Sequence, residues 1–328
     1  MFNKMILLGL AVGVQTSLAH ADIAYHYATA DEAAAILTAD DPYTLGLQPK
    51  EIGVQMQDAA KTTRADLNAR YRRFAADWDA RQTATMDQVI ADLQPVLSFL
   101  ESALPERVAL IKIDGQFIPP HTRANAIVFP TEVLGAPEEA LKDLFVHELH
   151  HVLSRHNPAL RDDLYAQVGF EPCAFEPPSA VTEDRLSNPD APVYRHFAPI
   201  AEGALDVDGA DGLIPYLSIT GPYDGEQGGA LGNYFKLDLL PVTVSDGVCT
   251  VVTEETGAVV RLPGDTEAFY DVIGRNTQYV IHPEEIAAVN FTLAMNALWN
   301  APADLPNPEI AERVLSFWRE VAQQATAP

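Results

Sequence analysis

A histidine–glutamate motif stands in residues 137–156, PEEALKDLFVHELHHVLSRH. His147, Glu148 and His151 follow the order H-E-x-x-H, and apolar residues at spacings of three and four predict that they lie on a helix. Histidines four residues apart project from one helix face, so both imidazoles can bind a single Zn²⁺ ion. Glu148 lies one residue round the helix and can reach a zinc-bound water as a general base. The motif therefore predicts a catalytic zinc site.

Neighbouring residues argue against two other kinds of metal site. A closed structural zinc site needs two further protein ligands, but Cys173 and Cys249 form no C-x-x-C pair. The metzincin pattern needs a glycine and a third histidine at fixed positions after the motif. This chain has Ser154 and Asn157 at those positions, and His156 falls one residue short. The motif is therefore not of the metzincin kind.

A second motif lies far downstream, in residues 279–291, YVIHPEEIAAVNF. Pro283 and the two acids after it are typical of the first turn of a helix. The two motifs together resemble the gluzincin peptidases, such as the thermolysin-like and neprilysin-like enzymes, in which a second helix donates a glutamate, often as E-x-x-x-D. The resemblance makes Glu285 the third zinc ligand, with Glu284 and then His282 as alternatives.

The resemblance departs from the family pattern at one position. Val289 stands where those families usually carry an aspartate that accepts a hydrogen bond from a ligating histidine. Either another acid or a backbone carbonyl must then orient that histidine, or the helix register differs and Glu284 is the ligand.

The reaction that the resemblance implies also needs a hydrogen-bond donor to a tetrahedral oxyanion, and gluzincins often use a tyrosine or a histidine. Tyr279 and His282 lie at the second motif and are the candidates for this donor. The alternatives are Tyr270, Arg123 and His156.

A wider resemblance covers the middle and the last third of the chain. The context H-E-L-H-H-V-L-S-R-H-N-P with a later Y-V-I-H-P-E-E is similar to a group of exported bacterial zincin-like proteins. Residues 122–130 read as a strand before the zinc helix, and in zincins such a strand usually forms the edge of the cleft. The resemblance makes residues 123–128 a candidate for pairing with an extended substrate, and an ordinary sheet strand is the alternative.

The N-terminus and the composition limit where the protein can be located and which classes of partner it can bind. Residues 1–21 combine Lys4, an apolar run and a small-residue end, which predicts a signal peptide cut after Ala21 and a periplasmic or secreted protein. No later segment approaches the length of a membrane helix. The formal charge of −25 disfavours nucleic acid and membrane partners. Cys173 and Cys249 are expected to form a disulfide in an oxidising compartment.

Periodicity and composition predict a mainly helical α+β fold. The resemblance implies that this fold is zincin-like, with the active-site helix packed beside a small sheet. The expected ranges are a signal peptide (1–21), a helical N-terminal region (22–106), a zincin core with the H-E-x-x-H helix (107–170), a β-rich insertion (171–264) and a helical C-terminal region with the third metal ligand (265–328).

These patterns favour an exported zinc-dependent hydrolase, a peptidase acting on peptides or proteins. One alternative is a catalytically inactive zincin-fold protein that serves as a periplasmic binding or scaffold protein, and Val289 favours it. Another is a zinc amidase acting on a cell-wall cross-link. Glu148 argues for turnover, because a structural site has no need of a base beside the metal. The sequence leaves the substrate and the oligomeric state open.

Overall fold

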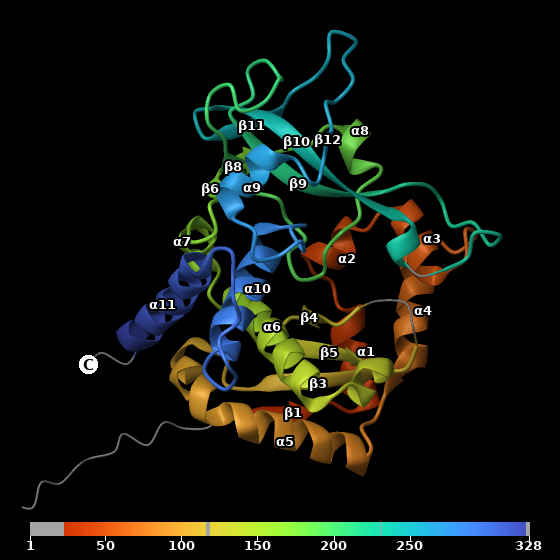
Figure 1. The fold of residues 1–328 in the computed structure, drawn as a ribbon. Helices are drawn as coiled ribbons and strands as arrows, with labels where there is room; N and C mark the ends of the chain where they lie inside the picture. The colour runs from red at the N-terminus through yellow and green to blue at the C-terminus, as the bar shows by residue number, and fades with distance from the viewer. Residues whose placement is uncertain (1–22, 116–118, 230, 326–328) are drawn as a thin grey trace, which may run out of the picture.

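The computed structural model describes residues 23–115, 119–229 and 231–325 (Figure 1). The predicted signal peptide, residues 1–21, lies outside the described residues. The described residues form two sheets, with helices packed around the first of them, which confirms the α+β class. A search of the described part of the chain for a helix with the length and hydropathy to cross a bilayer finds none.

The first sheet is built from β1 (Tyr25–Tyr27), β2 (Ala75–Ala76), β3 (Val108–Ile113), β4 (His121–Arg123) and β5 (Ala126–Pro130). Its order is β1-β3-β5-β4, and β2 pairs with the end of β3. The strand β3 is parallel to β1 and β5, whereas β4 is antiparallel to β5. The sequence of β3, VALIKI, is buried along its whole length, as expected for a strand that is covered on both faces.

Helices cover both faces of this sheet. Alternate residues of a strand face opposite sides of a sheet, so neighbouring residues of β3 belong to different cores. Val108 and Leu110 face a core that includes α5 (Ala80–Leu97) and α6 (Glu138–His156). Ala109 and Ile111 face the other core. The helices of that second core are α1 (Ala30–Thr38), α3 (Pro49–Met56) and α4 (Arg64–Phe74), and α2 (Pro42–Gly46) lies between α1 and α3 in the chain.

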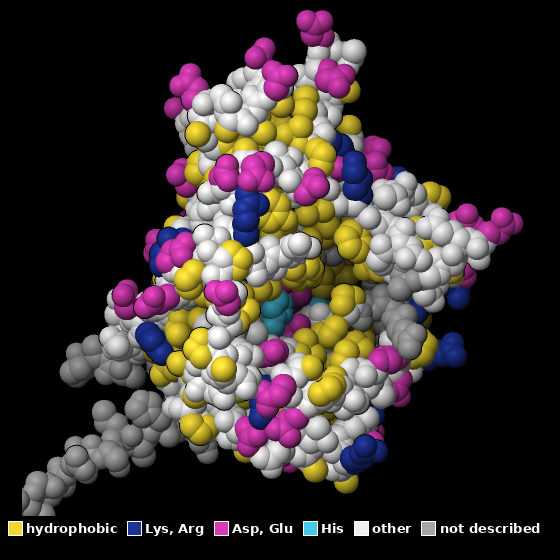
Figure 2. Space-filling view, viewed as in Figure 1, with side chains coloured by type: hydrophobic (Ala, Val, Ile, Leu, Met, Phe, Trp, Pro, Cys, Tyr) yellow, Lys and Arg dark blue, Asp and Glu magenta, His cyan; other side chains and the backbone are white. Residues whose placement is uncertain are grey.

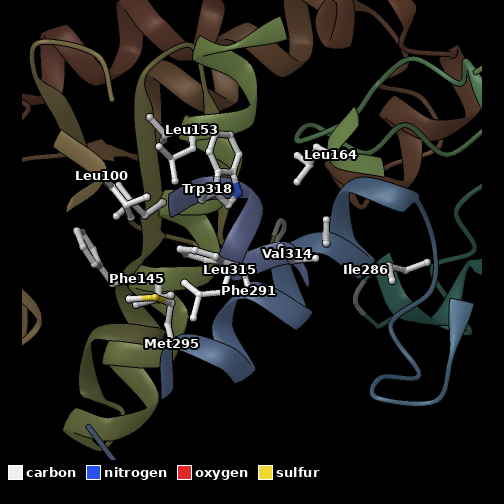
Figure 3. Close-up of a cluster of buried hydrophobic side chains, with 14 of the residues drawn as sticks. Leu100, Phe145, Leu153, Leu164, Ile286, Phe291, Met295, Val314, Leu315 and Trp318 are labelled. Atoms are coloured by element: carbon white, nitrogen blue, oxygen red, sulfur yellow. The ribbon is translucent and has the colours of Figure 1, made fainter. Parts of the chain in front are cut away.

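The helix α6, which carries the H-E-x-x-H motif, is packed against α10 (Pro283–Asn296) and α11 (Pro308–Ala325). Figure 3 shows apolar side chains of the three helices pointing toward one another, among them Phe145 of α6, Phe291 of α10 and Trp318 of α11. Burying one such side chain contributes about 1.5–3 kcal/mol. This core therefore holds α6 and α10 side by side.

The second sheet lies at the top of Figure 1, and its strands fall inside the range predicted to be β-rich. The long antiparallel pair of β9 and β10 forms its centre. A disulfide joins Cys173 to Cys249, as predicted. The strands are β6 (Glu171–Pro172), β7 (Ala174–Phe175), β8 (His196–Pro199), β9 (Gly212–Ile219), β10 (Phe235–Ser245), β11 (Val248–Val251) and β12 (Leu262–Pro263), and the neighbouring short helices are α7 (Arg161–Ala166), α8 (Ser179–Thr182) and α9 (Glu267–Ile273).

The expectation of one strand over residues 122–130 is wrong. The chain turns at Ala124, whose φ is +50°, so that β4 and β5 run antiparallel on either side of the turn. The alternation of apolar residues hides this turn because it takes up only two residues. Since β5 lies between β3 and β4, residues 126–128 cannot pair with a substrate, and β4 is the strand at this edge of the sheet.

Glu51 of α3 anchors a distant irregular segment of the chain. Its carboxylate is fully buried and accepts hydrogen bonds from the backbone N–H of Ser187 at 2.8 Å and from the Ser187 hydroxyl at 3.1 Å. Burial raises the pKa of Glu51 to about 7, although these hydrogen bonds act in the opposite direction. The protein therefore holds a titratable carboxyl where it ties residue 187 to the N-terminal helices.

Glu51→Gln is expected to change how stability depends on pH. Between the ordinary pKa of 4.5 and the folded-state value of about 7, the folded protein keeps a proton that the unfolded chain has lost, so stability falls as the pH rises through this window. The gap between the two values corresponds to about 3 kcal/mol. We expect the variant to match the wild type near pH 5 and to be more stable by up to about 3 kcal/mol near pH 8 in urea unfolding. An identical pH dependence in both proteins would contradict the role assigned to Glu51.

Candidate metal centre

Three atoms of the kind that bind metals meet between α6 and α10. Nε2 of His147 lies 3.1 Å from Nε2 of His151. Oε2 of Glu285 lies 3.2 Å from the first nitrogen and 3.4 Å from the second. A tetrahedral ion with bonds of about 2.0–2.1 Å holds its ligand atoms about 3.3–3.4 Å apart. The spacing of this metal triad, as we call the three residues, therefore suits one small metal ion.

Local sequence explains how the triad forms. His147 and His151 are four residues apart and share one face of α6. Pro283 begins α10, and Nδ1 of His282 accepts a hydrogen bond from the backbone N–H of Glu284 at 3.0 Å, which caps the helix. The first turn of α10 thus presents its acids to α6 from the positive end of a helix, where carboxylates are favoured.

Glu284 supports one member of the triad from outside it. Its Oε1 accepts a hydrogen bond from Nδ1 of His151 at 2.9 Å, and its Oε2 accepts hydrogen bonds from the hydroxyls of Ser154 and Tyr165, each at 2.6 Å. A proton on Nδ1 leaves the lone pair of His151 Nε2 free to bind a metal. Glu284 therefore makes the contact that Val289, the residue at the usual aspartate position, cannot make.

His150 is a second histidine close to Glu284, but it belongs to the apolar core. Its ring is fully buried and packs against Phe291 and Trp318, with centroid distances of 5.4 Å and 5.7 Å. Its Nδ1 lies 3.5 Å from Oε1 of Glu284, and among the described residues neither ring nitrogen has a hydrogen-bond partner. Glu284 already accepts three shorter hydrogen bonds, from His151, Ser154 and Tyr165. We therefore do not treat His150, His151 and Glu284 as a second metal site, and we assign Glu284 to support of the triad.

The irregular segment 187–190 contributes two further neighbours of the triad. The side-chain amide of Asn188 donates a hydrogen bond to Oε1 of Glu285 at 2.6 Å, which leaves Oε2 for the triad. The carboxylate of Asp190 lies within 4.8 Å of Glu148 and of His151. Neither residue could be predicted from the sequence, because an irregular segment has no periodicity that predicts which face of it is buried.

The acids at the site have pKa values shifted in opposite directions. Burial, followed by the charge of Asp190, raises the pKa of Glu148 well above its ordinary range. Burial also acts to raise the pKa of Glu285, but the charge of His151 and the hydrogen bond from His147 outweigh it and lower that pKa. Opposed shifts of this kind are typical of sites where one acid exchanges protons and another stays charged.

Tyr279 lies at the open side of the triad, with its ring centroid 6.5 Å from that of His147. The residue is 46% exposed. Burial of the hydroxyl and the charges of Glu285, Asp190 and Glu148 raise the pKa of Tyr279. The hydroxyl therefore keeps its proton and can donate a hydrogen bond.

His282, the other candidate donor, is engaged on both sides of its ring. Its Nδ1 accepts the hydrogen bond from Glu284 that caps α10, and its Nε2 donates to the carbonyl of Val193 at 3.3 Å. Burial lowers the pKa of His282 to about 4. We therefore assign this residue a structural role as a helix cap, because neither nitrogen is free to donate to a reacting atom.

The three alternative donors lie in other surroundings. Arg123 forms an ion pair with an aspartate next to α2. Tyr270 lies beneath the guanidinium of an arginine, and His156 is exposed at the end of α6. Of the five candidates from the sequence, Tyr279 is the one that lies beside the triad with its polar group uncommitted in the described structure.

The triad opens to solvent on one side. Figure 2 shows histidine side chains at the bottom of a hollow, with acidic and apolar side chains around them. The side chain of His147 is 18% exposed and that of His151 is 1% exposed, so access is from the His147 side. A separate pocket of about 850 Å³ borders Asp190 and Tyr165, but the described residues that line it do not include the triad. The candidate metal site therefore opens into the hollow.

Comparison with models of protein families, with curated proteins and with solved structures finds no match to this chain. The gluzincin resemblance accordingly rests on the two motifs themselves. Function is therefore inferred from the geometry and the chemistry of the site.

Proposed function

We propose that this protein is an exported zinc-dependent peptidase with a zincin-like fold. The observation that carries the proposal is the meeting of the two imidazole nitrogens and the Glu285 oxygen at separations of 3.1–3.4 Å. Two histidines and one carboxylate are a common ligand set of catalytic zinc sites, in which the fourth position stays open. The H-E-x-x-H helix packed beside a small sheet fits the arrangement that the gluzincin resemblance implies.

The surroundings of the triad fit a zinc ion with an open position. Oε2 of Glu148 is buried and has no hydrogen-bond partner among the described residues. Such an atom is costly unless something polar stands next to it, and a water molecule in the open position would satisfy it. Zinc bound to His147, His151 and Glu285 would act as a Lewis acid and lower the pKa of a coordinated water to about 7.

The chain's own residues then divide the work of amide hydrolysis. Glu148 takes a proton from the attacking water at Oε2 and delivers it to the nitrogen of the leaving amine. Tyr279 donates its hydroxyl proton in a hydrogen bond to the oxygen that becomes negative in the tetrahedral state. Glu284 holds His151 in the tautomer with the proton on Nδ1.

The two alternative functions differ from this proposal in turnover and in substrate. The inactive scaffold was favoured by Val289, but Glu284 supplies the hydrogen bond that is missing at that position. The uncommitted Glu148 also favours turnover over a purely structural site. A zinc amidase acting on a cell-wall cross-link would use the same residues, so only a substrate can separate it from a peptidase.

Export belongs to the same proposal. The disulfide between Cys173 and Cys249 is of a kind that forms and persists in oxidising compartments, in agreement with the predicted signal peptide over residues 1–21. A net charge of −25 repels nucleic acid and anionic lipids. Peptides or proteins outside the cytoplasm are therefore the substrates that we propose.

Metal content and peptide hydrolysis of the purified full chain test the proposal. We expect about one zinc per chain by mass spectrometry, cleavage of a mixed peptide library, and loss of cleavage on chelation with recovery when zinc is added. A wild-type protein that binds no zinc at neutral pH would contradict the metal centre. Zinc binding with cleavage of cell-wall cross-links alone would establish the amidase instead, and zinc binding without any turnover would establish the scaffold.

A further inference from the structure

The edge of the first sheet next to the metal triad is closed by another part of the chain. In the described structure β4 pairs with β5 alone. The backbone N–H of Thr122 in β4 points away from β5 and donates to Oδ1 of Asp190 at 2.6 Å, and the Thr122 hydroxyl donates to the same oxygen at 2.6 Å. Strand addition requires free backbone donors at an edge. The donor that an extended substrate would use here is therefore occupied.

The segment 187–190, which closes this edge, is tied to several elements. Ser187 is bound by Glu51 of α3, as described above. Arg155 of α6 donates hydrogen bonds to the carbonyls of residues 189 and 190, at 3.3 Å and 3.2 Å. Each of these bonds is made by a buried or partly buried group, so solvent competes with them only weakly. The segment is therefore a wall of the site.

This wall stands directly beside the reaction centre. Asn188 contacts Glu285 at 2.6 Å, and Asp190 lies within 4.8 Å of Glu148 and His151. Both wall residues are more than nine-tenths buried. A peptide chain that continued past the metal toward β4 would have to cross them.

The opposite side of the centre is open. Tyr279 is exposed there and His147 is partly exposed, and the hollow in Figure 2 lies on this side. A substrate that enters from this side reaches the metal and then meets the wall. The carboxylate oxygens of Glu148 and Asp190 approach within 4.8 Å of each other, which is too close for a peptide residue to pass between them. One ammonium group can hydrogen-bond to both oxygens at about 2.7–2.9 Å, so the centre can take the end of a chain.

We infer that this end is the free amino terminus, and that the site removes amino-terminal residues from peptides. The inference rests on the proposed function and names its substrate class. The groups that face the chain end are the carboxylates of Asp190 and Glu148, which attract a terminal ammonium and repel a terminal carboxylate. Arg155 lies 3.9 Å from Oδ1 of Asp190, but its hydrogen bonds go to Thr122 and to backbone carbonyls. Asp190 is thus the specificity-determining residue.

The first experiment compares free and N-acetylated heptapeptides of the same sequences with the zinc-loaded full chain, followed by mass spectrometry. The free peptides are expected to shorten from the amino terminus by one residue at a time. The acetylated peptides lack the charge that Asp190 binds. They are expected to react at least about tenfold more slowly, which is the effect expected when a hydrogen bond to a charged group is lost.

The second experiment uses Asp190→Asn. Asparagine keeps an oxygen that can accept the hydrogen bonds from Thr122, so the wall is retained while the charge is removed. The preference for free over acetylated peptides is expected to fall at least about tenfold, with zinc content unchanged. Asp163→Asn removes an exposed acid of α7 and serves as the matched control. Calorimetry with trialanine and N-acetyl-trialanine on the Glu148→Gln variant, with and without Asp190→Asn, measures the part of this preference that Asp190 contributes to binding.

The possible failures are distinguishable. Acetylated peptides cleaved at internal bonds as fast as free ones would overturn this inference and leave the peptidase standing. Failure of the zinc-loaded wild type to cleave any peptide would overturn the proposed function, and the inference with it. A preference for free amines that persists in Asp190→Asn, in both hydrolysis and binding, would show that another group recognises the terminus.

Discussion

Glu148→Gln is expected to lower the rate of peptide hydrolysis by about 10²- to 10⁴-fold, the range found when a general base is lost, while zinc binding is unchanged. Glu148 contributes no atom to the metal triad, whose members are His147, His151 and Glu285. Glutamine has nearly the shape of glutamate but cannot take a proton from water. Peptide hydrolysis followed by mass spectrometry gives the rate, and elemental analysis gives the zinc content of the same sample.

The same variant is expected to be at least as stable as the wild type. Glu148 is 3% exposed and, in the described residues, its Oε2 has no hydrogen-bond partner. Burial and the charge of Asp190 raise its pKa, so the structure disfavours the charged form that catalysis requires. A neutral amide avoids this buried charge. Urea unfolding of the metal-free proteins at neutral pH measures the difference.

A matched control for this prediction is available on the same helix. Glu139→Gln makes the same chemical change at the exposed start of α6, away from the triad, and should leave hydrolysis unchanged. Full activity in Glu148→Gln would rule out the mechanism. A variant that lost activity and stability together would instead identify Glu148 as a structural residue.

The two helices that carry the metal triad could be predicted because their signals are local. The motif of His147 and His151 and the apolar spacing around it define α6, and Pro283 with the acids after it marks the start of α10. The pairing of the cysteines could be predicted from their number. The two-residue turn at Ala124 could not, because an unbroken β-type pattern runs across it.

The roles of neighbouring residues within α10 could not be separated from the sequence. Successive residues of a helix point about 100° apart, so a shift of one position in the helix start exchanges Glu284 with Glu285. The cap formed by His282 decides this register, and histidine is not among the usual capping residues. His282, a candidate oxyanion donor from the sequence, is therefore the residue that orients the turn carrying Glu284 and Glu285.

The wall of the site was also beyond sequence reasoning. Asn188 contacts Glu285 across 97 residues of sequence, from an irregular segment with no helical or strand period. Its backbone path is set by Glu51 and Arg155, which lie on separate helices. Contacts of this kind are fixed by tertiary packing, so the fold must be known before the residues that determine specificity can be named.

Glu285→Gln and Glu284→Gln are expected to differ sharply in their effect on zinc, although the two changes are one residue apart. Oε2 of Glu285 is a member of the metal triad, and an amide oxygen is a much weaker zinc ligand than a carboxylate. Glu284 would act on a metal bound to the triad only through its hydrogen bond with Nδ1 of His151. Loss of a supporting residue costs about 10- to 100-fold in metal affinity, and loss of the ligand should cost more.

Competition with a calibrated zinc chelator measures both affinities, and circular dichroism verifies that each variant is folded. We use glutamine because Glu284→Ala would leave the hydroxyls of Ser154 and Tyr165 and the N–H of His151 without an acceptor. Each buried group left without an acceptor would lower the free energy of unfolding by about 1–3 kcal/mol. Glutamine keeps one acceptor oxygen, so a folded protein is expected.

The order of the two effects decides the register of α10 in solution. A larger loss in Glu285→Gln agrees with the geometry, in which Asn188 holds one oxygen of Glu285 and the other faces the two imidazoles. A larger loss in Glu284→Gln would mean that α10 presents the preceding residue to the metal, and the support assigned to His151 would then need another acceptor. Equal zinc binding in both variants and the wild type would place the ion away from α10, and neither the mechanism nor the recognition of an amino terminus by Asp190 would survive that result.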